Sequence, residues 1–416
     1  MVYKTALLTL IVGLCVYKQG HAQFSLDKFL CSARSDISLN PARARMDFLK
    51  ENSFNGPGIS RVEFRTRSND ANLSQEDFRF RITPGNPAEL KANKRYFDKQ
   101  VSLLDMEYRK LLNAALFERY FIAMEHIFES NRLKNLQKKR EKLQEITEMI
   151  NNTDAQYELD LGDLIDAESN DLELKLDIGN ARIRIDEIEY KMRQYYDFQD
   201  TVDWSKSKLM DVDEVLEAFE RFRAEEGNID HISLEMMEQE NQLRAERYNI
   251  EKSESRRNIG FLQAEYDTER GNETFDHFGY QVGIRLPIVN PDKPDLIRRK
   301  LATMDDEALL NEEQITHFQK KELVVLRMEH LAKQHKDIQQ KLALFRQKNY
   351  LGFQSADKTL NISDLLRLNE FYADLLNKQN NLERKIYDGY LEYLDLSGHL
   401  SSMPFRNYLT KGMPEF

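Results

Sequence analysis

Proline is the residue that most constrains this chain, because its ring inside a helix costs about 3 kcal/mol. No proline occurs between Pro87 and Pro287. Glycine is also absent from residues 88–161, which leaves 74 residues without a helix breaker, and residues 295–351 form a second such stretch of 57. As continuous helices these stretches would be roughly 110 Å and 85 Å long. Helices that long must pack side by side, as a coiled coil or a cylinder of helices.

The apolar residues of the first stretch recur at steps of three and four, which is the spacing of a helix. They are Leu103, Leu104, Met106, Tyr108, Leu111, Leu112, Leu116 and Phe117. Their stripe is broader than the seam of a two-helix coiled coil. It favours a helix with neighbours on two sides, as in an α-barrel, and a helix buried in a bundle explains it equally well.

Two pairs of segments alternate with a period of two, which predicts β-strands whose two faces meet different environments. Residues 62–67 and 78–82 form the first pair, and residues 262–266 and 278–286 form the second. Turn-forming residues lie between the members of each pair. The sequence therefore predicts two β-hairpins.

Four strands are too few to close a transmembrane barrel, which needs about eight, and an open edge in lipid would leave backbone groups unpaired. If the hairpins enter a membrane, several chains must share one barrel. A small soluble sheet packed on the helices is the alternative reading. The long helices favour the shared barrel, and so does the secretory signal that the first residues of the chain resemble.

The first residues resemble a cleavable secretory signal, with Lys4 before an apolar run from Thr5 to Tyr17, followed by Lys18-Gln-Gly-His-Ala22. We expect cleavage after Ala22, because thirteen apolar residues are too few to span a membrane. The remaining chain has 58 basic and 71 acidic side chains, which argues against a nucleic-acid partner. Cys31 is its only cysteine, so it forms no internal disulfide.

Strand alternation also assigns side chains to faces. Arginine facing lipid at mid-depth would cost about 2–4 kcal/mol, so in a membrane barrel the apolar face would meet lipid and the arginines would line the lumen. The predicted lipid-facing residues are Val62, Phe64, Phe78, Phe80, Ile82, Phe278, Tyr280, Val282, Ile284 and Leu286. The predicted lumen-facing residues are Arg65, Arg67, Arg79, Arg81 and Arg285.

The two halves of the chain resemble each other at an offset of about two hundred residues. The segment 81–87 matches 285–291, and Asp163-Leu-Ile matches Asp364-Leu-Leu. The predicted organisation is a signal peptide (1–22), a first repeat (23–200), a linker (201–228), a second repeat (229–398) and a tail (399–416). The first repeat contains hairpin 59–83, long helix 88–156 and tip 157–168. The second repeat contains hairpin 257–288, long helix 295–351 and tip 352–367.

Together these features resemble the TolC-like outer membrane efflux family over roughly residues 26–398. Two local signatures add to the duplicated layout. One is Tyr280-Gln-Val-Gly-Ile-Arg-Leu-Pro-Ile, which is similar to the last strand of the family before its long descending helix. The other is Tyr350-Leu-Gly followed by Ser363-Asp-Leu-Leu, which is similar to elements around its periplasmic tip.

The resemblance implies a mainly α fold with a small β part. Very long helices would form a periplasmic α-barrel or coiled-coil rod, and two hairpins would contribute four strands to a shared 12-stranded trimeric β-barrel. It further implies an exit duct in the cell outer membrane, extending into the periplasm, with a periplasmic adaptor and an inner-membrane transporter as partners. No cofactor or metal is expected.

The resemblance also places Asp163 and Asp364 at a narrow entrance near the helical tips, where a ring of carboxylates would favour cations. Capping of the following helices explains both aspartates as well. The sequence departs from the family pattern in an extra stretch at 353–362 and in Arg367, which stands where some relatives carry an acidic residue.

Two other classes of function fit the sequence less well. Catalysis is disfavoured, because the chain has no His-Glu-x-x-His, Gly-x-Ser-x-Gly or phosphate-binding glycine loop. A soluble periplasmic coiled-coil scaffold or adaptor fits the polar composition. The duplicated layout favours the channel, since adaptors usually carry one helical hairpin.

Overall fold

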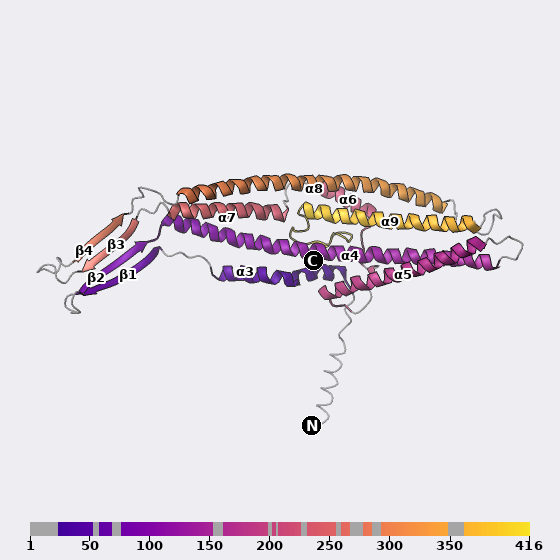
Figure 1. Cartoon of the computed structure of the whole chain (residues 1–416), viewed down its shortest axis with the longest axis horizontal. Coiled ribbons are helices and arrows are strands. Elements are labelled where there is room, and N and C mark those ends of the chain that lie inside the picture. The colour runs from indigo at the N-terminus through magenta and orange to yellow at the C-terminus, as the bar shows by residue number, and fades with distance from the viewer. Residues whose placement is uncertain are drawn as a thin grey trace, which may run out of the picture. The chain divides into compact units, whose positions relative to one another are not determined.

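The computed structural model describes residues 24–52, 58–68, 76–152, 161–198, 202–204, 207–225, 231–254, 259–266, 278–284, 293–347 and 362–416. Its helices and strands follow one another as shown in Figure 1. In chain order they are α2 (Leu26–Cys31), η1 (Ser32–Ser35), η2 (Ile37–Leu39), α3 (Asn40–Glu51), β1 (Ile59–Ser68), β2 (Glu76–Pro84), α4 (Pro87–Asn152), α5 (Leu161–Tyr195), α6 (Val212–Ala224), α7 (Ile232–Glu254), β3 (Ile259–Tyr266), β4 (Phe278–Ile284), α8 (Lys293–Gln347) and α9 (Ile362–Leu396).

Two very long helices occupy the stretches that lack helix breakers. Helix α4 has 66 residues and α8 has 55, which corresponds to roughly 100 Å and 80 Å of helix. Pro87 is the first residue of α4 and Pro294 the second of α8, where a missing N–H costs no hydrogen bond. The predicted mainly α fold with very long helices and a small β part is confirmed.

The chain divides into two compact units. One contains Leu111–His231, His317–Phe416 and the N-terminal residues up to Leu39, and the other contains Asn40–Lys110 and Ile232–Thr316. The strands and the complete helices α3 and α7 belong to the second unit.

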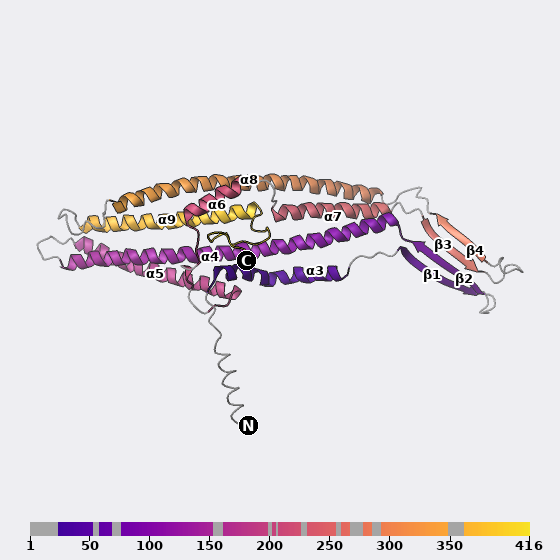
Figure 2. The same ribbon diagram turned by 180° about the vertical axis from the view of Figure 1, so that it is seen from behind.

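The four strands form one antiparallel sheet in the order β1-β2-β3-β4. The two predicted hairpins are joined where β2 pairs with β3, for example at Phe80 with Ala264 and Arg81 with Gln263. Figure 2 shows the same single sheet from behind. Residues 69–75 and 267–277, where the hairpin turns were predicted, lie outside the described residues.

The core of the first unit is apolar and lies between helices. Leu136 and Leu143 of α4 pack with Ala167, Leu174 and Ile178 of α5. A second, aromatic cluster lies where α6 packs on α9, with the Phe219 and Tyr393 ring centroids 4.9 Å apart. Helix α6, which lies in the predicted linker 201–228, is therefore anchored by packing on α9.

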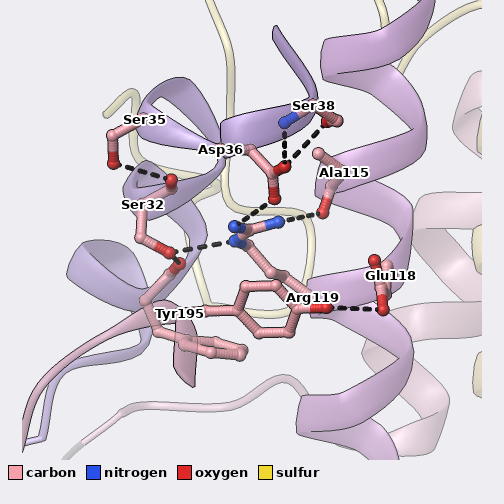
Figure 3. A network of polar contacts seen from close by, with 9 residues as sticks. Ser32, Ser35, Asp36, Ser38, Ala115, Glu118, Arg119 and Tyr195 are labelled. Atoms are coloured by element: carbon pink, nitrogen blue, oxygen red, sulfur yellow. Dashed lines mark hydrogen bonds and ion pairs between the residues drawn. The ribbon is translucent and has the colours of Figure 1, made fainter. Parts of the chain in front are cut away.

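A buried arginine connects three parts of the first unit (Figure 3). Arg119 of α4 is 1% exposed. Its Nε donates to Ser32 Oγ at 2.9 Å, its Nη1 to the Ala115 carbonyl oxygen at 2.8 Å and its Nη2 to Asp36 Oδ2 at 2.8 Å. The guanidinium carbon lies 4.3 Å from the centroid of the Tyr195 ring, at the end of α5. One side chain thus joins the N-terminal segment to α4 and α5.

The electrostatics of this network keep its charges in place. Burial raises the pKa of Asp36, but hydrogen bonds from the Ser38 hydroxyl and amide and from Arg119 outweigh burial, so the pKa lies below its ordinary value. Burial and the hydrogen bond to Glu118 raise the pKa of Tyr195 to about 12, so its hydroxyl remains a donor. The stabilisation from Asp36 is present above about pH 4 and is lost as the pH falls through its lower folded-state pKa.

We expect Arg119→Met to reduce the free energy of unfolding by about 3–5 kcal/mol, because it leaves the Asp36 carboxylate buried without its cation. The measurement is urea unfolding of the detergent-purified chain followed by circular dichroism. Arg45→Met is the control, since Arg45 pairs with Glu107 at 2.6 Å with half of its side chain exposed. That change is expected to cost at most about 1 kcal/mol. Equal losses in the two variants would contradict the role assigned to Arg119.

Candidate functional site: the two faces of the sheet

The strand register gathers the apolar side chains on one face. Directly paired residues of an antiparallel sheet point to the same side, and Phe64 pairs with Phe80, Val62 with Ile82 and Phe278 with Tyr266. This face carries nine of the predicted lipid-facing residues, namely Val62, Phe64, Phe78, Phe80, Ile82, Phe278, Tyr280, Val282 and Ile284. Leu286 lies outside the described residues.

The apolar face is strongly exposed in the single chain. Tyr280 is 92% exposed, and Phe64 and Phe278 are 65% exposed. Strand β3 extends the face with Leu262 and Tyr266, which the face assignment from sequence did not include. Their places follow from the same alternation, but only the β2–β3 pairing aligns them with the other strands. An exposed face of aromatic and aliphatic side chains of this kind requires a covering apolar environment.

The opposite face carries the predicted arginines together with carboxylates. Arg65 lies directly opposite Arg79 in the register, a pairing of like charges that is unfavourable alone. Glu63 relieves it, because its carboxylate oxygens lie 2.6 Å from Arg61 Nε and 2.8 Å from Arg65 Nη2. Arg79 Nε donates to Glu265 Oε1 at 2.7 Å.

In the described strands, this polar face holds five arginines and three carboxylates, so its excess positive charge is smaller than the arginines alone indicate. The arginines are Arg61, Arg65, Arg67, Arg79 and Arg81, and the carboxylates are Glu63, Asp77 and Glu265. Arg285 lies outside the described residues. Sequence reasoning missed the counter-charges, although alternation alone puts Glu63 and Glu265 on the arginine face.

A layered contact lies in the middle of the polar face. Arg81 Nε and Nη2 donate to Gln263 Oε1 at 2.9 and 2.7 Å. The Arg81 guanidinium carbon lies 4.1 Å from the centroid of the Phe261 ring. The Phe261 ring in turn covers Gly283, where a Cβ would overlap Phe261 Cε1 and Cδ1. Glycine at 283 is therefore required for the ring to lie flat across β4.

The predicted tip residues lie at the starts of the return helices. Asp163 is the third residue of α5 and Asp364 the third of α9, so the matched positions are equivalent. Both lie inside the first turn rather than at the preceding N-cap position, and an acidic group there is favoured by the helix dipole. Asp364 and Arg367 are exposed. The side chain of Asp163 and residues 153–160 and 348–361 lie outside the described part of the tips.

Helix α5 carries two apolar stripes on opposite sides. The buried stripe contains Ala167, Leu174, Ile178, Ala181, Ile188 and Met192. The exposed stripe contains Ile165, Leu172, Leu176, Ile183 and Tyr190, each 59–66% exposed. At 100° per residue the two sets are centred about 180° apart. The chain itself covers one side of α5, and the other side has the composition of a second packing surface.

Helix α8 repeats this arrangement. Its buried residues include Val324, Met328, Leu331 and Leu342, and its opposite side exposes Ile297, Leu301, Met304, Ile315, Phe318 and Leu326. Like α5, α8 therefore presents apolar side chains on two opposite sides.

Comparison with solved structures finds outer-membrane channels. The chain matches CusC with a TM-score of 0.63 at 8% identity, over 92% of this chain and 94% of that chain. It matches the MtrE channel of Neisseria gonorrhoeae in its open state with a TM-score of 0.61 at 11% identity, over 90% and 88%. It matches VceC of Vibrio cholerae with a TM-score of 0.58 at 11% identity, over 90% and 96%.

The chain has the TolC-like outer-membrane channel fold. The resemblance found in the sequence is thereby confirmed at the level of the fold. No protein-family model and no curated protein matches the sequence. The TolC-like fold is thus recognisable here from its helix lengths, strand pattern and coverage rather than from residue identities.

The described residues contain neither a candidate membrane-spanning helix nor a candidate metal site. None of the helices in this part of the TolC-like chain combines the length and apolarity needed to cross a membrane. Within the same ranges, no group of three or more His, Cys, Asp or Glu side chains is arranged to hold a metal ion.

We expect Gly283→Ala to destabilise the chain by about 1–3 kcal/mol, because its Cβ would overlap the Phe261 ring. Gly279→Ala is the matched control on the same strand, since its Cβ would meet Glu265 Cβ at an ordinary 3.8 Å. Urea unfolding of both variants, alone and combined with Phe261→Ala, measures the coupling. The cost of Gly283→Ala should largely disappear once Phe261 is removed. An undiminished cost would place the strain elsewhere.

Proposed function

We propose that this chain is a protomer of an outer-membrane exit duct, through which substrates leave the cell after an inner-membrane transporter and a periplasmic adaptor hand them over. The observation that carries the proposal is the four-stranded sheet with one exposed apolar face and one arginine-rich face. Such a sheet meets lipid on one side and water on the other when it forms part of a barrel wall.

Assembly follows from the edges of the sheet. Strands β1 and β4 are the outer strands in the described sheet, and in lipid their free backbone groups would need partners. Three copies would close a 12-stranded barrel, the arrangement that the resemblance to the TolC-like family implies. The duct is therefore a homotrimer in this proposal. The ten predicted lipid-facing strand residues would lie against lipid, and Arg65, Arg67, Arg79, Arg81 and Arg285 would face the lumen.

The exposed stripes of α5 and α8 support the same assembly. A helix with apolar residues on two opposite sides needs two neighbours, and in a cylinder of helices the second neighbour comes from the adjacent protomer. These stripes would lie between protomers. The proposal thus explains the exposed side chains of the strands and those of the long helices by one assembly.

The tips are the proposed contact with the adaptor and the proposed pore entrance. Asp163, Asp364 and Arg367 would lie there, at the starts of α5 and α9. Acidic residues at the first turns are stabilised by the helix dipoles, and the same carboxylates would favour cations at the entrance. The duct would serve a tripartite efflux or type I-like secretion system.

The decisive measurement combines the mass of the detergent-purified mature chain, by mass photometry, with its single-channel conductance in a planar bilayer. We expect a trimer and discrete conductance steps. A monodisperse soluble species without conductance would overturn the duct and favour a periplasmic scaffold or adaptor.

The same recordings check the residue assignments. Changing Arg65 and Arg67 to Gln should shift the reversal potential in the direction of lower anion selectivity. Asp364→Asn should shift it in the direction of lower cation selectivity. A pore that is indifferent to the arginine changes would contradict the lumen assignment. Indifference to Asp364→Asn would remove the aspartate from the entrance.

We expect Leu176→Asp to lower the fraction of trimer at least tenfold, because it would bury a carboxylate in the interface between protomers. Leu176 is 62% exposed in the single chain, so the monomer fold should be unaffected. Asn180→Asp is the control, since it adds the same charge on an exposed part of α5 outside the stripe. Sedimentation in detergent measures the fraction. A normal trimer in the Leu176 variant would exclude this face from the interface.

A further inference from the structure

The arginines of the polar face differ in what neutralises them. Arg61 and Arg65 share the Glu63 carboxylate, and Arg79 is paired with Glu265. Arg81 instead donates to the side-chain oxygen of Gln263, which is neutral. In the described strands, no ion pair joins Arg81 to a carboxylate. Glu63 lies directly opposite Arg81 on β1, but its oxygens are paired with Arg61 and Arg65, so the positive charge of Arg81 is only partly offset on this face.

Arg81 is also held in one orientation. One edge of its guanidinium, Nε and Nη2, is occupied by Gln263 Oε1, and one face lies on the Phe261 ring at 4.1 Å. Phe261 itself packs on Gly283. The stack of Gly283, Phe261 and Arg81 therefore runs from β4 through β3 to β2. Arg67, by contrast, is exposed on the same face.

The remaining donors fit one kind of ligand. A guanidinium has five N–H groups, and Gln263 takes two of them, which leaves the pair of Nη atoms at its outer end. Two parallel N–H groups at this spacing bind two oxygens of a carboxylate, sulfonate or phosphate. Because the group is already oriented, an oxyanion that binds it loses little side-chain freedom.

We propose that Arg81, positioned by Phe261 and Gln263, is a binding site for the oxyanion group of an organic anion. The inference deepens the proposed function, because within a barrel the site would lie in the lumen in three copies and would favour anionic substrates. Arg81 would contact the ligand. Phe261 would act as a positioning residue through Arg81.

The test measures binding of 4-fluorobenzenesulfonate to the full mature chain in detergent by ¹⁹F NMR, with neutral 4-fluorobenzenesulfonamide as the matched probe. The sulfonate should bind in preference to the sulfonamide. Arg81→Gln should weaken sulfonate binding roughly tenfold or more, as expected for loss of charge-assisted hydrogen bonds. Arg81→Lys should recover only part of it, since an ammonium cannot bind two oxygens in parallel.

Two control variants separate a built site from the general charge of the face. Arg67→Gln removes the same charge from an exposed arginine, and the double change Arg79→Gln with Glu265→Gln removes an ion pair at constant net charge. Both should leave the affinity within about twofold, which is the range expected for a screened exposed charge. Equal weakening by Arg67→Gln and Arg81→Gln would overturn the site.

Phe261→Leu tests the positioning role without any change in charge. It should weaken the sulfonate several-fold and leave the sulfonamide unchanged, and an unchanged sulfonate affinity would overturn the positioning role of Phe261. This assay does not depend on conductance. A conducting trimer without the binding preference would refute the oxyanion site alone, and a specific site in a chain that never conducts would refute the duct alone.

Discussion

The length of the unbroken helices is the constraint from which the rest of the architecture follows. A helix of 66 residues cannot bury its apolar side chains against itself, and it is far longer than the core of an ordinary domain. It needs other helices along its whole length. The return helix α5 meets α4 with one apolar stripe, and its second stripe on the opposite side remains for another neighbour. A helix pair of this kind leaves an apolar surface for a further neighbour.

The sheet, like the long helices, has groups that need partners beyond a single chain, but for a different reason. Backbone N–H and C=O groups at the edge of a sheet need partners wherever water is absent, and side chains of period two offer an apolar face and a polar face. The register aligns these faces across all four strands. Exposed aromatic residues on one side and paired charges on the other are what the proposed wall between lipid and water requires. A single copy of the chain provides part of such a wall.

Each of four arginines on the polar face has a particular partner. Three arginines are compensated by two glutamates on neighbouring positions or strands, which removes the repulsion that Arg65 and Arg79 would otherwise have. Arg81 is held by neutral partners and keeps its charge. In the first unit, Arg119 shows the opposite use of the same side chain, since each of its three guanidinium nitrogens donates to an oxygen of the protein. Exposure and the nature of the partner decide whether an arginine stabilises the fold or remains free to bind.

Much of this could be predicted from the sequence, because helix breakers and side-chain periodicity are local properties. The absence of proline and glycine determined where the long helices lie, and alternation determined which strand residues share a face. The tertiary structure alone decided that β2 pairs with β3, that Glu63 and Glu265 neutralise particular arginines, and that Gly283 accommodates Phe261. It also decided that Arg119 reaches Asp36, which lies 83 residues away in the chain. Such contacts depend on which distant segments are brought together, and a local pattern carries no information about that choice.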